Sequence, residues 1–324
     1  MTNQKEKQLL FQKIKVDDLV SKDHAYRKIL KMLDFNAVSS RFENLYSDRG
    51  RAGIGPEKAI KMFVLQFMED YSDRQMEKAL EENTAVKLFC GYELLEDTPD
   101  HSSFGKLRDR FGTKAIGDIF RWVNEEMEKK GLIGKCFSFV DSTAIITKTQ
   151  LWSERDRAIA EGEKSFNNKT AETVETKTDP DARFGCKGKE KYWFGYKRHV
   201  CVDAKAGAIT KVAVTAANET DAEGLTKVCP QSGLVMADKA YSTKKAQNTM
   251  KANGCHSGAI LKNNMKNKNK EKDSWLTKIR MPFEGVFSFC KKRSRYRRKH
   301  KVQRQAFFEA IAWNIKVMQR YAHA

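Results

Sequence analysis

The first 130 residues follow a helical period, because their apolar side chains recur every three or four positions. The segment 56–72, "PEKAIKMFVLQFMEDYS", predicts a helix that begins at Pro56, a residue favoured in the first turn. A second helical pattern begins after Ser72, whose hydroxyl is suited to cap a helix. This pattern runs towards Gly91, a residue typical of helix ends.

A third helix is predicted from Asp100 or Ser102, either of which can cap it, through Phe111. Three short helices with tight links fit a helix-turn-helix that reads DNA. They fit a packing or dimerisation module equally well, and the pattern alone leaves both interpretations open.

Beyond residue 130 the period shortens to that of strands. The segment 135–145 predicts a strand, and 192–218 predicts a hairpin that turns at Asp203–Gly207. Helices and strands then alternate: a helix at 219–229, a strand within 233–242, a helix at 242–254 capped by Ser242 and ended by Gly254, a strand at 257–262, a helix from Pro282 to 299, and an amphipathic helix at 303–321.

Three meandering strands followed by strand–helix units predict a mixed sheet with helices on its faces. This succession matches the ribonuclease H-like fold. We therefore expect an α+β protein with a helical N-terminal domain, residues 1–130, and a ribonuclease H-like domain, residues 131–324. A polar insertion at about 150–190 carries the turn signals Asn167-Asn168 and Asp179-Pro180.

Charge is distributed unevenly along the 324 residues, whose formal net charge is +19. Residues 1–130 hold 23 basic and 23 acidic side chains, whereas residues 261–324 hold 18 basic and 4 acidic. From Gly285 to Arg304 there are nine Lys or Arg and no acid. A positive excess this concentrated indicates a polyanionic partner, and we favour nucleic acid over a merely solvated surface.

Composition excludes several other classes. The seven cysteines are odd in number and include no C-x-x-C pair, so neither a disulfide framework nor a zinc ribbon is indicated. No apolar run approaches the roughly 20 residues that span a bilayer. The first residues lack the apolar centre of a secretory signal. We expect a cytoplasmic protein without a membrane partner.

Three carboxylates stand out by position. Asp141 follows five residues of which four are apolar or aromatic, and we expect it to end the first strand. Asp238 follows "GLVMA" at the end of the fourth strand, and Glu284 lies in the first turn of the next predicted helix. Each has an ordinary structural explanation, such as a turn or a favourable helix start. Together they could bind two hard cations and support phosphoryl transfer.

The chain resembles the DDE transposases of bacterial insertion sequences. One group of that family carries a Tyr-x2-Arg-x3-Glu-x6-Lys signature, matched here by Arg280, Glu284 and Lys291, whereas Thr277 occupies the Tyr position. Blocks similar to the family's occur in order along nearly the whole chain: "YSDRQMEKAL", "PDHSSFGKLRDRF", "FVDST", "YWFGYKRHVCVD", "NETDAE" and "ADKAYS".

The resemblance implies Mg²⁺-dependent cleavage at the ends of a transposable element and strand transfer into target DNA. Asp141, Asp238 and Glu284 would be the catalytic and metal-binding acids, with two Mg²⁺ ions and Mn²⁺ able to substitute. It further implies a nucleoid-associated homodimer on DNA that recognises terminal inverted repeats. The residues expected to bind DNA are Arg280, Lys291, Lys292, Arg293, Arg295, Arg297 and Arg298.

Three alternatives remain from the sequence. A ribonuclease H-like nuclease that only cuts would have the same strands and acids. A non-catalytic DNA-binding derivative would keep the fold, and an RNA-binding protein would use the basic segment but leave Asp141 and Asp238 unexplained. Trp152 and Trp193 are candidates for base stacking, although Trp193 is better explained as core. His199 is better explained as a satisfied sheet residue, and His101 as a helix-start residue.

Overall fold

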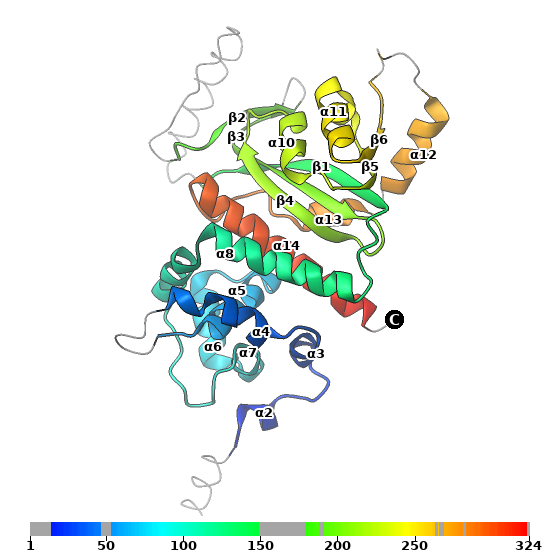
Figure 1. The fold of residues 1–324 in the computed structure, drawn as a ribbon. Helices are drawn as coiled ribbons and strands as arrows, with labels where there is room; N and C mark the ends of the chain where they lie inside the picture. The colour runs from blue at the N-terminus through cyan, green and yellow to red at the C-terminus, as the bar shows by residue number, and fades with distance from the viewer. Residues whose placement is uncertain are drawn as a thin grey trace, which may run out of the picture. The chain divides into compact units, whose positions relative to one another are not determined.

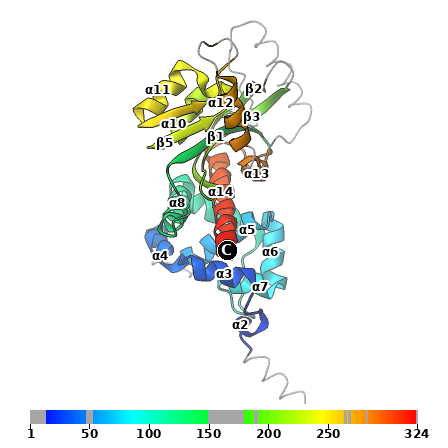
Figure 2. The ribbon, with the colours of Figure 1, turned by 90° about the vertical axis from the view of Figure 1, so that its right-hand side faces the viewer.

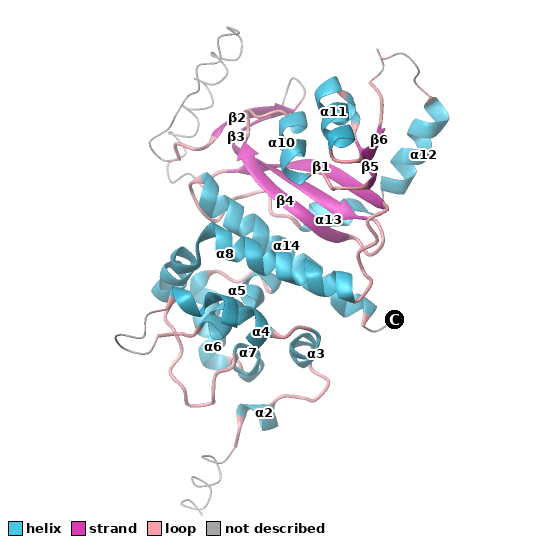
Figure 3. Ribbon diagram, in the orientation of Figure 1, coloured by secondary structure: helices cyan, strands magenta, loops and turns pink. Residues whose placement is uncertain are grey.

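The computed structural model describes residues 14–46, 53–148, 179–187, 191–262, 265, 269–280 and 283–322. The chain divides into two compact units, which are described separately. One comprises the residues up to Val123 together with those from Met318 onward, and the other extends from Asn124 to Val317. Figure 1 labels their helices and strands, and Figure 3 distinguishes the helical first unit from the sheet of the second.

The described part of the first unit is helical. Its core is formed largely by α5, in which Met62, Phe63 and Leu65 are fully buried. The elements are α2 (Val16–Leu19), α3 (Ala25–Met32), α4 (Phe35–Ser39), the 3₁₀ helix η1 (Ser40–Leu45), α5 (Pro56–Met68), α6 (Asp73–Glu82), α7 (Thr84–Cys90) and the start of α8 (His101–Lys129).

Local sequence signals account for most of these boundaries. Pro56 is the first residue of α5. Ser72 caps α6 through a capping box, and Gly91 ends α7 in the left-handed conformation, as predicted. The single helix predicted between them is wrong, because Asn83 ends α6 and accepts the N–H of Ala85, at 2.9 Å, to begin α7.

Asp100, rather than Ser102, caps α8, since its carboxylate accepts the N–H groups of Ser102 and Ser103 at 2.7 and 3.1 Å. The predicted end at Phe111 coincides with a break at Gly112, where φ is 68° and ψ is 177°. Only glycine adopts such a backbone readily. The helical chain then resumes to Lys129, which the sequence pattern did not predict.

The second unit contains a six-stranded mixed sheet in the order β2–β3–β1–β5–β6, with β4 paired to β3. β3 runs antiparallel to β1, β2 and β4, whereas β5 runs parallel to β1 and β6. This arrangement confirms the predicted α+β class and the ribonuclease H-like sheet. The strands are β1 (Phe137–Ile146), β2 (Arg183–Lys187), β3 (Lys191–Asp203), β4 (Ala208–Ala216), β5 (Gly233–Ala237) and β6 (Cys255–Ala259).

Helices cover both faces of this sheet. α10 (Asp221–Val228) and α11 (Lys244–Ala252) lie on one face, and α13 (Glu284–Phe289) and α14 (Lys299–Tyr321) on the other (Figures 1 and 2). The first face holds a buried apolar cluster that includes Val140, Leu225, Val235, Tyr241 and Met250. The 3₁₀ helix η2 (Lys239–Ser242) follows β5, and α12 (Lys270–Arg280) precedes α13.

Two predictions near the candidate acids are wrong. β1 does not end at Asp141 but continues to Ile146, because β3 remains paired with it along that length. The helix predicted from Pro282, which lies outside the described residues, to 299 ends at Phe289. The following chain instead pairs with the end of β1: Ile146 N–H donates to Lys292 O at 2.8 Å, and Ser294 N–H donates to Ile146 O at 2.9 Å.

Other differences are local. Thr243, not Ser242, caps α11. The final helix begins at Lys299. Nearly all its sides are buried, including Gln305 and Asn314, so the prediction that this helix is amphipathic is wrong. α12 and β2 had not been predicted, β2 because it lies in the polar insertion. Within the described residues, no helix is both long and apolar enough to cross a bilayer.

Candidate functional site

Asp141 and Asp238 lie side by side in the sheet. The parallel register of β1 and β5 pairs Val140 with Ala237, so the next residue on each strand is one of these acids. β5 ends there, and the Asp238 carboxylate accepts the N–H of Ala240 at 2.9 Å to begin η2. Both acids are half-buried. Two neighbouring carboxylates therefore stand where the pairing of these strands ends.

The start of α13 lies against the same part of β1. Because successive side chains alternate between faces, Phe139 and Asp141 lie opposite Val140, which belongs to the cluster under α10 and α11. The ring of Phe139 stacks on Phe283, with centroids 4.2 Å apart. Glu284 follows Phe283 directly as the first residue of α13. The backbone of Glu284 is thus on the face that bears Asp141, while its side chain lies outside the described residues.

A third carboxylate contacts the residue next to Asp141. The N–H of Ser142 donates to Asp141 Oδ1 at 2.7 Å, and the Ser142 hydroxyl donates to Asp221 Oδ1 at 2.9 Å. Lys197 Nζ lies 3.3 Å from the same Asp221 oxygen. Sequence reasoning missed Asp221 as a site residue. The one sequence feature that pointed to Asp221 was its place in the block "NETDAE". An acid at that position is also explained as an ordinary first residue of a helix.

The negative charge of these acids affects the pKa of the nearby Tyr241. Burial raises the pKa of its phenol well above the ordinary value of 10.0. The carboxylates of Asp221, Asp141 and Asp238 raise it further, in that order. The phenol therefore stays neutral, in a region where three carboxylates from three different segments gather.

The donor atoms present here suit a hard divalent cation, which prefers carboxylate oxygens. Among the residues whose side chains are described, no group of three or more His, Cys, Asp or Glu converges closely enough to hold a metal ion. Asp141 of β1 and Asp238, which directly follows β5, come immediately after the last paired residues of the two strands, Val140 and Ala237.

The basic segment predicted to bind DNA, residues 291–298, is fixed to the sheet through its backbone. Besides the two bonds to Ile146, the N–H of Arg298 donates to the buried carboxylate of Asp179 at 3.0 Å. Arg297 Nε donates to Lys148 O at 3.0 Å, so part of that guanidinium is used internally.

The side chains of this segment differ in exposure. Lys291, Lys292, Arg293 and Arg298 are exposed, and Arg295 and Arg297 are half-buried. The side chain of Arg280, at the end of α12, lies outside the described residues. The structure therefore places most of the predicted cations on an irregular segment that bridges to the end of β1 at Arg293.

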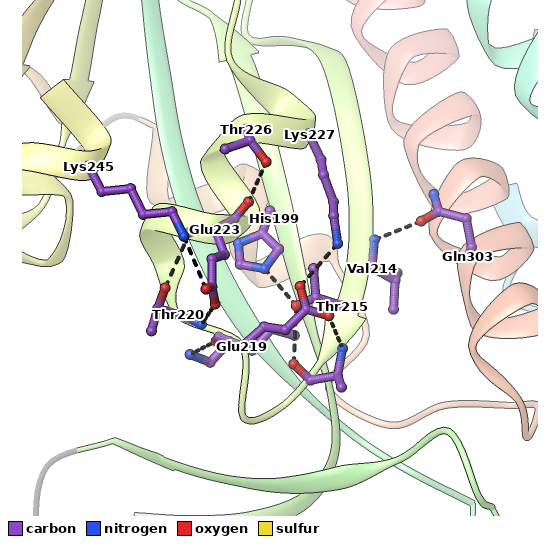
Figure 4. A network of polar contacts seen from close by, with 12 residues as sticks. His199, Val214, Thr215, Glu219, Thr220, Glu223, Thr226, Lys227, Lys245 and Gln303 are labelled. Atoms are coloured by element: carbon purple, nitrogen blue, oxygen red, sulfur yellow. Dashed lines mark hydrogen bonds and ion pairs between the residues drawn. The ribbon is translucent and has the colours of Figure 1, made fainter. Parts of the chain in front are cut away.

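Three of the remaining candidates, His199, His101 and Trp193, make contacts within the described structure. His199 is buried, with its Nε2 2.9 Å from Thr215 Oγ1, and burial lowers its pKa to about 4 (Figure 4). His101 starts α8 and contacts Glu77 at 3.0 Å. Trp193 is only half-buried and donates to Tyr196 O at 3.0 Å, and Trp152 lies outside the described residues.

Comparison with known proteins gives two family matches. Residues 14–110 match a family described as "Transposase domain (DUF772)", and residues 133–315 match one described as "Transposase DDE domain". Among solved structures, a piggyBac transposase synaptic complex with hairpin DNA is similar at 8% identity and a TM-score of 0.39, over 91% of this chain and 72% of that one. A Mos1 transposase paired-end complex is similar at 10% identity and a TM-score of 0.18, over 86% and 85% of the two chains.

Proposed function

We propose that Asp141, Asp238 and Glu284 are the catalytic acids of this chain, which belongs to the transposase DDE domain family. The protein is a DDE transposase, an enzyme that cleaves DNA and transfers strands. The observation that supports this assignment of residues is the sheet register. It sets Asp141 beside Asp238, while the stacked pair of Phe139 and Phe283 brings the start of α13 to the same face.

The enzyme uses divalent metal ions, as DDE domains generally do. The ion proposed is Mg²⁺, bound as a pair, with Mn²⁺ able to substitute. The chemistry of the donors supports this, because carboxylates bind hard cations. When bound, such ions stabilise the attacking and leaving oxygens of an in-line phosphoryl transfer. Asp141 and Asp238 would bind from the strand ends, and Glu284 from the first turn of α13.

DNA is the substrate, and the basic segment supplies its contacts to phosphate. Arg280, Lys291, Lys292, Arg293, Arg295, Arg297 and Arg298 are proposed to bind DNA. Their charge holds the backbone near the acids without reading bases. Terminal inverted repeats and target DNA would be bound in turn by a homodimer, because two element ends must be joined. Contacts to the repeats are proposed for the helical N-terminal domain, residues 1–130, the insertion at 150–190 and the basic segment.

The test is strand cleavage and joining on a labelled duplex that carries the element's own end. Wild type and Glu284→Gln are compared in Mg²⁺ and in EDTA, at low salt because phosphate contacts weaken as salt rises. We expect nicked and joined products with Mg²⁺ only, and a loss of at least about a hundredfold in the variant, since even residues that merely support metal ligands matter 10–100-fold. Glu271→Gln, an exposed acid of α12, is the matched control.

Each other outcome has a definite meaning. Nicks without joined product would favour a nuclease that only cuts. DNA binding without cleavage in wild type, while a related active enzyme works on its own end in parallel, would favour a non-catalytic derivative. Full activity in Glu284→Gln would remove Glu284 from the site.

A further inference from the structure

We infer that Lys197, Asp221 and Ser142 form a hydrogen-bonded network that positions the Asp141 carboxylate, a role that rests on the proposed function of Asp141. These three residues are called the Ser142 network below. They come from β3, the first turn of α10 and β1, so the network joins the sheet to the helix that covers it. They would act as positioning residues, because none of them is proposed to touch metal or DNA.

β1 loses one of its two strand neighbours at Asp141. Its pairing with β5 ends at Val140, whereas its pairing with β3 continues to Ile146. At Asp141 and Ser142 the backbone is therefore held by β3 along one edge. A catalytic carboxylate at such a point needs another restraint, because productive geometry tolerates errors of only about 0.5 Å.

Ser142 supplies that restraint with both of its donors. Its N–H donates to Asp141 Oδ1 at 2.7 Å and so fixes the carboxylate directly. Its hydroxyl, on the opposite face of the strand, donates to Asp221 Oδ1 at 2.9 Å. Rotation of this part of β1 would break the second bond. The contact with α10 therefore resists rotation of the acid.

Lys197 fixes Asp221 in turn. Its Nζ lies 3.3 Å from Asp221 Oδ1 and donates to Glu219 O at 2.8 Å. The side chains of Lys197 and Asp221 are 14% and 22% exposed. At this burial the pair is weakly screened. The ammonium also offsets the negative charge that Asp221 adds beside Asp141 and Asp238.

Asp221 is better explained as a positioning residue than as a metal ligand. Its Oδ1 already accepts from a hydroxyl and faces an ammonium group. Within the described part of the chain, Asp221 does not form a metal-binding group of three with Asp141 and Asp238. It nevertheless contributes to the field of these acids, as the pKa of Tyr241 indicates.

The network is tested by Mn²⁺ binding to the full chain without DNA, followed through the electron paramagnetic resonance signal of free Mn²⁺. We expect Ser142→Ala and Asp221→Ala to raise the Mn²⁺ dissociation constant about tenfold, the lower end of the usual effect of residues that orient metal ligands. Ser142→Thr keeps the hydroxyl and should bind Mn²⁺ like wild type. Thermal unfolding without metal accompanies each measurement, so that a loss of folding is recognised.

Lys227→Met is the matched control. Lys227 of α10 pairs with the Glu219 carboxylate at 3.0 Å (Figure 4) and is not one of the three residues of the Ser142 network. Asp141→Asn separates the proposed metal-binding function of Asp141 from the positioning role of the Ser142 network. If Asp141→Asn binds Mn²⁺ as wild type does, the proposed function of Asp141 fails. If Asp141→Asn weakens Mn²⁺ binding but Ser142→Ala and Asp221→Ala bind Mn²⁺ as Lys227→Met does, the network has no positioning role.

Discussion

His199 shows how burial in this sheet determines the charge of a side chain. Its ring contacts the Thr215 hydroxyl on β4 and lies under Gly224 of α10, where an added Cβ would come within 2.1 Å of the ring. Burial is the largest cause of its lowered pKa, about 4, and the nearby Asp221 only partly opposes it. The imidazole is therefore neutral at physiological pH.

This lowered pKa predicts a loss of stability in mild acid. The unfolded chain binds a proton at His199 near pH 6.5, whereas the folded chain does so only near pH 4. Stability from this residue is thus fully present above pH 6.5 and is lost as pH falls towards 4. Between pH 7 and 4.5 we expect wild type to lose about 2 kcal/mol more unfolding free energy than His199→Gln, measured by urea denaturation.

The chain's other five histidines are present in both proteins, so the difference between the two proteins isolates His199. Thr215→Val tests the hydrogen bond separately, and it should leave the extra loss in acid in place. If wild type and His199→Gln lose the same unfolding free energy between pH 7 and 4.5, His199 is already protonated, or accessible to protons, in the folded chain.

Single residues differ in how far the sequence predicts them. Asp141 and Asp238 could be singled out from the sequence because each directly follows a run of mostly apolar residues. Asp221 was not, since its bond to Ser142 joins residues 79 apart and depends on how α10 lies over β1. A charged residue in a first helical turn gives no sign of such a contact.

At the scale of elements, α13 is a short helix held at both of its ends. Phe283 stacks on Phe139 at its start. Just after its end, Lys291 N–H donates to the buried carboxylate of Glu309 at 3.2 Å, and Glu309 lies 2.6 Å from the guanidinium of Arg198. These contacts tie the helix that begins with Glu284 to β3 and α14 within the second unit.

The buried ion pair predicts an asymmetric response to mutation. Arg198→Met or Glu309→Leu alone leaves a buried group without its partner, and each should destabilise the protein by roughly 3–5 kcal/mol. The double change Arg198→Met with Glu309→Leu removes both charges and should recover most of that loss. Urea denaturation of the three variants measures the coupling.

Arg121→Met provides a control, because its pair with Asp118 is exposed and should contribute less than about 1 kcal/mol. Additive losses in the double variant would contradict the buried-pair account. Strand cleavage, measured separately with the double variant, would show whether apolar packing at positions 198 and 309 is enough to keep α13 in place.

Elements were predicted best where local chemistry decides them. Ser72 and Gly91 mark real helix ends because capping is a local interaction. The helix predicted from Pro282 to 299 failed for the opposite reason. Beyond Cys290 the backbone bonds to Ile146, so pairing with a distant strand replaces the continuation of the helix.

At the scale of the whole molecule, the order of strands was predictable because apolar period and turn residues mark each strand and hairpin. The order confirmed by the sheet brings Asp141 and Asp238 together although they are far apart in sequence. β2 was not predictable, because its five residues include two cations and a glycine and lack an alternating apolar pattern. α12 was not predictable either, because Leu276 is the one buried side chain among those that the structure describes in this helix.

The charge distribution predicts how the whole molecule binds DNA as salt changes. Lys292 and Arg293 are exposed on the segment bonded to the end of β1, close in sequence to α13. Each phosphate contact releases counterions, so the logarithm of the affinity falls with the logarithm of salt by about 0.9 per contact. We expect Lys292→Gln with Arg293→Gln to lower this slope by about 2 on any duplex, measured by fluorescence anisotropy.

Lys227→Gln with Lys251→Gln, which removes two exposed cations from α10 and α11, should leave the slope unchanged. Equal changes in both double variants would mean that DNA responds to the overall charge of +19 rather than to this segment.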